Sequence, residues 1–402
     1  MDVDEWGIGE RIAAHRVRRG LTQEELAGLV GISLSLMKKI EIGHRHVTRF
    51  SQLVLFAQAL RIKDLHELTG VRLTLTPDGF RSHPAAAAVR AALTDHSRPG
   101  GEPPALETLA AGIERTWQVW QAPSPWRYAQ VGQELPALLH AARAAVALHD
   151  GQERRRALRE ASKLYQLTRT WTKRVGEYEL SWLAADRAVT AALEADDPDM
   201  AAAAAWNLAM ILSAKGHTDE ALGVVNRALD DLRPYMDEPS DARLAAWGGL
   251  HLLGAAEAAR DDRSAEAWRM LAMAERAAAR TGETNHYRMV FGPTNVAVHR
   301  VSVSVELGRT REALDLAEHV AVEGAPAVER RLTHRLDVAR SYTRKRNDLG
   351  AIHMIQHIHR ESPEELTHSV MVREVLRELM GRARPAVLGE LQPLLQAAGL
   401  PD

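Results

Sequence analysis

The apolar residues of this 402-residue chain recur at helical spacing along almost its whole length. Alanine, leucine, glutamate and arginine dominate, and all four are strong helix formers. Runs that alternate apolar and polar residues, as half-buried strands do, are nearly absent, and the one candidate, residues 71–76, is too short to define a sheet domain. The pattern therefore predicts an all-α fold.

The N-terminal part of the chain, up to Gly70, carries start and stop signals for five short helices. Gly20 ends the first predicted helix, and Thr22, followed three positions later by a glutamate, provides the capping box of the second. Gly31 ends the second helix and Ser33 caps the third. Two helices joined by a tight turn that contains glycine predict a helix-turn-helix unit, whose second helix can enter the major groove of DNA.

Two segments rich in proline and glycine, residues 76–84 and 97–104, interrupt the helical pattern, and a short alanine-rich helix is expected between them. These breaks predict the domain boundary. We divide the chain into a five-helix helix-turn-helix domain over residues 1–70, a linker with a short helix over 71–104, and a helical-repeat domain over 105–402.

The charge distribution differs between these parts. The whole chain has a net charge of −2, but the segment from Arg11 to Lys63 holds ten Lys or Arg against three Asp or Glu. Such a local excess is typical of a polyanion-binding surface, although a solvated basic face would look the same. Cysteine is absent, which excludes disulfides and thiolate metal sites. No apolar run is long enough to span a membrane, and the acidic start is unlike a secretory signal, so we expect a cytoplasmic protein.

The N-terminal segment resembles a known family. The residues in register are Arg16, Gly20-Leu21-Thr22-Gln23-Glu24-Glu25-Leu26-Ala27, Gly31-Ile32-Ser33, Ile40-Glu41 and Gly43. Together they resemble the phage-repressor-like, or XRE, helix-turn-helix family. The resemblance implies that Gln23 contacts a phosphate, and that Arg16 and Glu41 form an ion pair that ties the first helix to the third.

The resemblance and the chemistry of the neighbouring loop together give a set of expected DNA contacts. The residues are Gln23, Ser33, Leu34, Ser35, Lys38, Lys39, Arg45 and Arg49. Lys38 and Lys39 can reach guanine acceptors or phosphate, and Leu34 can cover a thymine methyl. The two arginines follow the third helix in a loop that suits phosphate contacts. For the lysines the alternative is an ordinary solvated helix surface.

The C-terminal region contains a weak repeat. Residues 205–228, with Gly216 between two alanine-rich helices, resemble a tetratricopeptide repeat, a helix pair of about 34 residues. Degenerate copies are expected near residues 176–188, 255–274, 301–317 and 339–363. An XRE module followed by such an array resembles many actinobacterial regulators and, more distantly, peptide-pheromone receptor regulators. This implies an α-solenoid that senses an effector and dimerises, so that the protein binds an inverted-repeat operator in double-stranded DNA.

Three residues are candidates for an effector groove in this array. Asn207 lies on the first helix of the best repeat, at a position that faces the groove in the resembling fold. An asparagine there can clamp a peptide backbone with one donor and one acceptor. Asn295 and His299 occupy comparable faces of another repeat. Each could equally be an ordinary polar residue, and the effector could be a peptide or a small molecule.

Catalytic and metal-binding motifs are not found. The sequence has no phosphate-binding loop, no HExxH motif and no nucleophile elbow. His353, His357 and His359 cluster, but no acidic partner lies at a recognisable spacing, so we expect no metal and no cofactor. We therefore expect a transcription regulator that is not an enzyme and binds no membrane. The alternative is an interaction adaptor whose repeat groove captures a partner protein.

Overall fold

The computed structural model describes residues 7–47, 50–62, 65–69, 83–325, 327–382 and 385–400. The all-α fold predicted from the sequence is confirmed: the described residues form helices and turns, and their only β pairing is an isolated bridge between Thr284 and Phe291. Among these residues no helix is both long and apolar enough to cross a bilayer. The proposed strand at 71–76 lies outside the described residues.

The N-terminal domain is a bundle of five helices. They are α1 (Ile8–Arg18), α2 (Gln23–Val30), α3 (Leu34–Glu41), α4 (Phe50–Ala59) and α5 (His66–Thr69). Ile12, Leu26, Met37 and Phe56 are fully buried and bring α1 to α4 around one core. Burying these side chains stabilises the bundle by about 1.5–3 kcal/mol each. The bundle holds α3 against α2 with its polar face outward.

A second group of helices begins the larger domain. It comprises α6 (Ala86–Thr94), α7 (Leu106–Gln121), α8 (Arg127–Leu148) and α9 (Gly151–Arg174). Trp120, Tyr128 and Trp171 are fully buried in its core. The Trp171 indole donates to the Tyr128 carbonyl at 2.8 Å, so a large apolar ring is buried without leaving its polar group unpaired.

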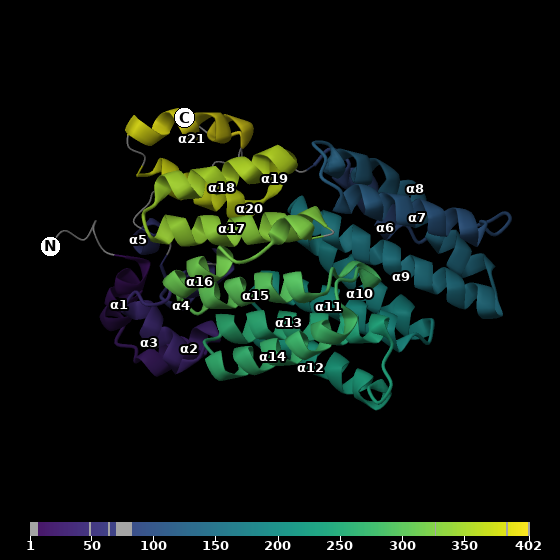
Figure 1. Ribbon diagram of the computed structural model, residues 1–402, viewed down its shortest axis with the longest axis horizontal. Helices are drawn as coiled ribbons and strands as arrows, with labels where there is room; N and C mark the ends of the chain where they lie inside the picture. The colour runs from purple at the N-terminus through teal and green to yellow at the C-terminus, as the bar shows by residue number, and fades with distance from the viewer. Residues whose placement is uncertain are drawn as a thin grey trace.

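The remaining helices form antiparallel pairs stacked side by side (Figure 1). The helices are α10 (Tyr178–Glu194), α11 (Pro198–Ala214), α12 (Thr218–Leu232), α13 (Asp241–Arg260), α14 (Ser264–Thr281), α15 (Pro293–Glu306), α16 (Thr310–Ala317), α17 (Val328–Arg344), α18 (Asp348–Glu361), α19 (Glu364–His368), α20 (Val370–Met380) and α21 (Pro385–Ala397). Alanines fill the contacts between neighbours, because small side chains let helices approach closely.

The turn inside each pair contains one residue in the left-handed conformation. These residues are Gly176, Gly216, Asp262, Gly308 and Arg346. The intervals between them exceed the roughly 34 residues of a tetratricopeptide repeat. The difference follows partly from helix length, since α13 alone has 20 residues.

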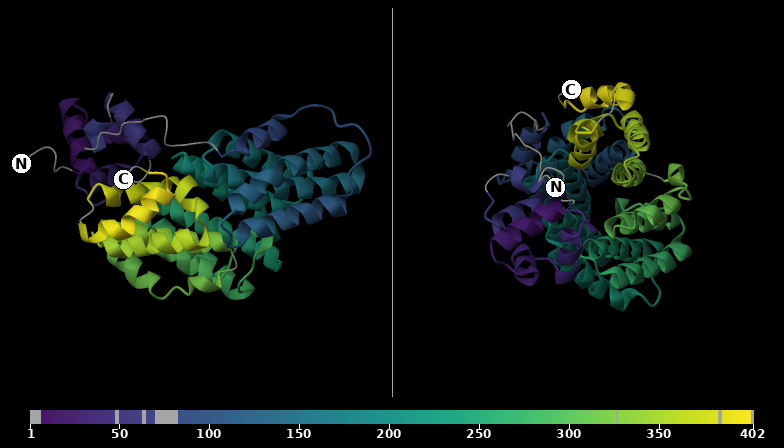
Figure 2. Two further views of the ribbon diagram at one scale, coloured as in Figure 1. Left: turned by 90° about the horizontal axis from the view of Figure 1, so that it is seen from above. Right: turned by 90° about the vertical axis from the view of Figure 1, so that its left-hand side faces the viewer.

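The two ends of the array are joined by buried charge. Arg127 of α8 is fully buried and donates to Glu365 of α19 at 2.6 Å, while Arg174 of α9 donates to the other oxygen of the same carboxylate at 3.1 Å. The Tyr128 hydroxyl also donates to Glu365, at 2.9 Å. Figure 2 shows the five N-terminal helices at the end of the array opposite α7 and α8.

Candidate nucleic-acid interface

The geometry between α2 and α3 depends on three local residues. The Thr22 hydroxyl accepts from the Glu25 amide at 3.1 Å, and Glu25 accepts in return from the Thr22 amide at 2.7 Å. Gly31 ends α2 at φ 72°, a conformation that costs glycine no steric strain. Ser33 then caps α3 by accepting from the Leu36 amide at 3.2 Å. The two helices are thereby joined by a short, fixed turn.

Arg16 and Glu41 lie together across α1 and α3. Arg16 Nε and Nη2 donate to the two Glu41 oxygens at 2.6 and 3.1 Å. Hydrogen bonding to Glu41 raises the pKa of Arg16 above its ordinary value, so the guanidinium keeps its charge. Gln23, expected at a phosphate, donates its amide to Glu41 Oε2 at 2.7 Å. Its side chain therefore takes part in the interaction that fixes α3.

The outer face of α3 carries the expected base-reading residues. Ser35 and Lys38 are exposed, and Leu34 and Lys39 are half-buried. Arg49 lies outside the described residues. A basic, solvent-facing helix preceded by a fixed turn is the arrangement that inserts into a major groove.

Comparison with known families matches residues 8–68 to a helix-turn-helix domain. Residues 8–68 are a helix-turn-helix domain. The match covers α1 to α5 and none of the helical array. No curated protein and no solved structure matches the chain. In a domain of this kind the helix that follows the turn is called the recognition helix, and α3 holds that position here.

The recognition helix does not face solvent along its whole length, because the helical array contacts it. Asp262, in the turn between α13 and α14, places Oδ2 2.6 Å from Lys39 Nζ and 3.2 Å from Ser35 Oγ. Its carboxylate side chain is only 4% exposed. Two of the residues expected to read bases therefore bind a carboxylate of the same chain, in the place where DNA would present its acceptors.

Arg45 strengthens the contact between the two domains. It is 8% exposed and donates to the Ala259 carbonyl at 2.8 Å. Burial lowers its pKa, and the negative charges of Glu306 and Asp262 oppose that effect. The phosphate contact expected for Arg45 therefore requires that the domains separate.

The turns of the array fit closely around the helix-turn-helix domain. Asp262 adopts a left-handed conformation at φ 61°, which aspartate tolerates better than most residues. A Cβ at Gly308, in the next turn, would lie 3.0 Å from the His44 carbonyl, so glycine allows the close approach. A cavity of about 60 Å³ remains in the interface. The polar contacts between the domains are those of Asp262 with Lys39 and Ser35 and of Arg45 with Ala259.

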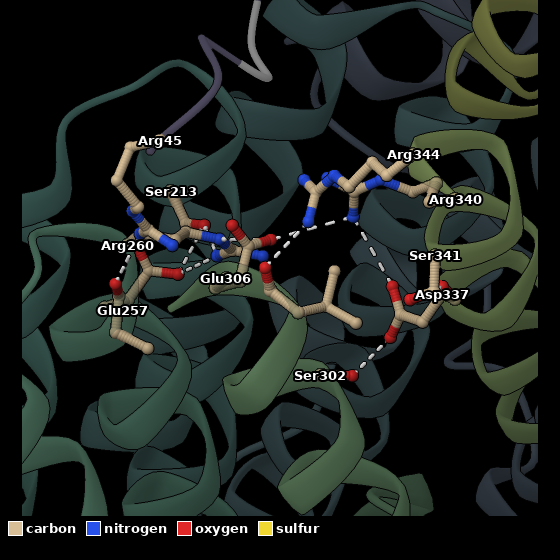
Figure 3. Close-up of polar contacts among 12 residues, drawn as sticks. Arg45, Ser213, Glu257, Arg260, Ser302, Glu306, Asp337, Arg340, Ser341 and Arg344 are labelled. Carbon is tan, nitrogen blue, oxygen red and sulfur yellow. Dashed lines mark hydrogen bonds and ion pairs between the residues drawn. The ribbon is translucent and has the colours of Figure 1, made fainter. Parts of the chain in front are cut away.

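Behind Arg45 a buried polar network runs across the helices α11, α13, α15 and α17 (Figure 3). Glu257 is fully buried and bonds Arg260 and the Ser213 hydroxyl, the latter at 2.6 Å. Arg260 also lies 3.5 Å from Glu306, which in turn lies 3.7 Å from Arg340. Burial alone would lower the pKa of Arg260, but Glu257 and Glu306 raise it above its ordinary value. The network keeps each buried cation beside a carboxylate.

The expected groove residues are largely enclosed. Asn207 is 3% exposed and donates to Gln166 at 3.0 Å and to the Ala203 carbonyl at 3.1 Å. Asn295 is also 3% exposed, and its Oδ1 has no hydrogen-bond partner. His299 shares a 2.9 Å hydrogen bond with the Asn295 carbonyl, and burial lowers its pKa to about 3.

Other candidate chemistry is sparse in the described ranges. His353 and His357 contact each other at 3.0 Å on an exposed face, and no group of three or more potential metal ligands occurs among the described residues. Asp262 is a contact residue that was not expected from the sequence. The one sequence feature that could have indicated it is its position in a turn after a predicted helix. Its contact with Lys39 joins distant parts of the chain and so has no local sequence pattern.

Proposed function

We propose that this protein is a transcription regulator that binds an inverted-repeat operator as a homodimer and responds to an effector bound by its helical array. The observation that supports DNA binding is the helix-turn-helix domain, with Lys38 exposed and Lys39 and Ser35 on the same face of α3. The array is the part available for sensing and dimerisation. A cytoplasmic location and the absence of catalytic activity are part of this proposal.

We further propose that the arrangement described here is a closed state of the regulator. Asp262 bonds Lys39 and Ser35, and Arg45 is buried against Ala259, so these side chains cannot bind DNA at the same time. DNA and the array compete for one face of α3. An effector that favours separation of the domains would raise DNA affinity, since a ligand shifts an equilibrium by its differential affinity for the two states.

The test begins with the full-length protein and fragments of its own genome. Selection is carried out at near-physiological salt, because basic domains bind any DNA when salt is low. An enriched inverted repeat with half-sites about one helical turn apart supports the dimeric regulator. Absence of enrichment for both the wild type and an opened variant contradicts it and favours the adaptor.

The opened variant is Asp262→Asn. Asparagine keeps the size of the side chain and tolerates the left-handed turn, but it removes the charge that binds Lys39. We expect DNA affinity to rise about 3- to 10-fold, the effect of losing an ion pair worth roughly 1 kcal/mol. Asp315→Asn is the matched control, because Asp315 is exposed and its substitution changes the net charge by the same amount. Equal affinities of both variants would exclude the closed state.

A further inference from the structure

Two histidines on the outer face of α18 bring their ring nitrogens together. His353 is exposed and His357 is half-buried, and because they are four residues apart they share one face of the helix. Their Nε2 atoms lie 3.0 Å apart. The opposite face of α18 is buried and fixes the helix against its neighbours through Ala351, Ile352, Ile355 and Ile358. The two nitrogens are therefore held by a helix that is packed into the array.

The orientation of the two rings differs from that of a straight hydrogen bond. A ring nitrogen lies about 1.15 Å from the centroid of its imidazole, so a straight N–H···N bond at this separation would place the centroids about 5.3 Å apart. The observed distance between the centroids is 4.6 Å, and the ring planes are 83° apart. At least one ring is therefore turned away from the line that joins the two nitrogens.

A metal ion bound to both nitrogens accounts for both distances. With metal–nitrogen bonds of about 2.0–2.1 Å, nitrogens 3.0 Å apart subtend an angle of about 91–97° at the metal, and the centroids lie about 4.6–4.7 Å apart. A tetrahedral ion would need nitrogens about 3.3–3.4 Å apart. The pair thus fits two neighbouring positions of a square-planar or octahedral ion, the geometry typical of Cu(II) and Ni(II).

The charges around the pair are mixed. Arg360 and Arg335 are the cations that act on His357, and Glu323 is the carboxylate that opposes them. Arg335 is itself matched, because Glu323 lies 2.5 Å from it and Glu361 also binds it. Electrostatic attraction alone does not hold a cation here, so the bond to imidazole nitrogen must do so. This disfavours Mg²⁺ and Ca²⁺, which prefer several oxygen ligands.

We propose that His353 and His357 form a binding site for a divalent transition-metal ion, Cu(II) or Ni(II), on the outer face of α18. Among the described residues no third protein ligand joins them, so water fills the remaining positions. His359, the third histidine of the cluster, points elsewhere, since its Nδ1 is buried without a partner. No metal was expected from the sequence because an acidic partner was missing, but the geometry requires only the two imidazoles. The assignment is independent of the proposed regulator.

Metal binding requires that both Nε2 atoms are free of protons. In the metal-free protein one of them carries the proton that lies between the rings. A neutral imidazole has two nitrogens, so this proton moves to Nδ1 of the same ring when the ion binds. The ion then occupies the place beside both nitrogens, and a neutral pair releases no proton.

The test is a calorimetric titration of the full-length, untagged protein with CuCl₂ or NiCl₂, at about pH 7.5, where most histidines are neutral. We expect Cu(II) to bind more tightly than Ni(II), following the general order of affinities for divalent ions. MgCl₂ is the negative arm and should show no binding at this site. Electron paramagnetic resonance of the Cu(II) complex should show nitrogen coupling from two imidazoles.

Two variants give the test its specificity. His353→Gln and His357→Gln each remove one ligand and keep a good helix former at the position. Each should weaken Cu(II) binding by at least about 10-fold, because even an indirect partner of a metal ligand is worth that much, and should reduce the nitrogen coupling to one imidazole. His286→Gln is the control, since His286 is exposed and has no histidine four residues away. It should bind as the wild type does.

Three results overturn the assignment. The wild type binds neither Cu(II) nor Ni(II), or both site variants bind Cu(II) as tightly as the wild type, or the nitrogen coupling is the same in all four proteins. Circular dichroism on the same samples shows whether a variant has kept its helices, so a folding defect is recognised. Operator selection tests the regulator separately, and neither experiment decides the other.

Discussion

Two parts of this chain concentrate basic residues, and they differ in what lies opposite the cations. Where the helix-turn-helix domain meets the array, Lys39 and Ser35 contact Asp262, and Arg260 of the array lies beside Glu257 and Glu306. Deeper inside the array, the Nε and Nη2 atoms of Arg169 are buried without a hydrogen-bond partner. The first region joins its cations to carboxylates, whereas the second leaves buried donor atoms unused.

This difference separates two outcomes of burying a cation. A cation that is matched within the chain holds domains or helices together, and removing it leaves a carboxylate unpaired. A buried cation without a partner lowers stability, because its desolvation is not compensated. Substituting one cation in each region by methionine should therefore change stability in opposite directions.

The largest effect is expected at the matched region. Arg260→Met leaves Glu257, which is fully buried, without its cation, and we expect the free energy of unfolding to fall by about 3–5 kcal/mol. Chemical denaturation followed by tryptophan fluorescence measures the change. Arg269→Met, on the exposed side of α14, is the control and should change it by less than about 0.5 kcal/mol.

The next effect concerns DNA. Lys39→Ala should weaken binding to the selected operator by roughly 1–3 kcal/mol if Lys39 reads a base. Because Lys39 also holds the closed state through Asp262, its loss should cost about 1 kcal/mol more in the Asp262→Asn background than in the wild type. Titrating the operator DNA with the wild type, the two single variants and the double variant measures this difference as a double-mutant cycle. Equal losses in both backgrounds would show that Lys39 does not stabilise a competing closed state.

At Arg169 the change in the free energy of unfolding should have the opposite sign to that expected at Arg260. Arg169→Met should raise the free energy of unfolding by about 1–2 kcal/mol, because a buried unpaired charge is replaced by an apolar side chain of similar length. Chemical denaturation in chloride measures the change. Arg155→Met, which alters an exposed arginine of the same helix, is the control. A destabilised Arg169→Met would mean that the guanidinium is matched after all, and the contrast between the two regions would fail.

The smallest effect is a pH dependence at His299, inside the array. The pKa of His299 is about 3 in the folded protein, lowered by burial and then by Arg330, against about 6.5 for an unfolded histidine. Between these values the unfolded chain binds the proton and the folded chain does not. Stability is therefore full above pH 6.5 and falls as the pH decreases, by at most about 1 kcal/mol from His299 between pH 6.5 and 5.5.

His299→Gln should flatten this part of the stability profile, while His286→Gln, at an exposed position, should leave it unchanged. Denaturation midpoints measured from pH 7 to pH 5 provide the comparison. Identical slopes for the wild type and His299→Gln would place the histidine in a more solvated setting.

Much of the helix-turn-helix domain could be predicted because its signals are local. Thr22, Gly31 and Ser33 specify caps and turns through neighbours within a few residues, and the structure places those hydrogen bonds where the pattern predicted them. The short helix before the array was also expected, at 85–94 against the observed Ala86–Thr94. The expected roles of Lys38, Asn207 and Asn295 remain predictions.

The sequence by itself determined the all-α fold and the recognition helix, because helix propensity, capping and apolar spacing act over one or two turns of chain. Only the tertiary structure decided which cations are matched. Lys39 meets Asp262 and Arg127 meets Glu365 although each pair is far apart in the sequence. In the part of the chain that the structure describes, the Nε and Nη2 atoms of Arg169 are buried without a hydrogen-bond partner. Electrostatic energy depends on distance in space and on burial, and neither is determined by position along the chain.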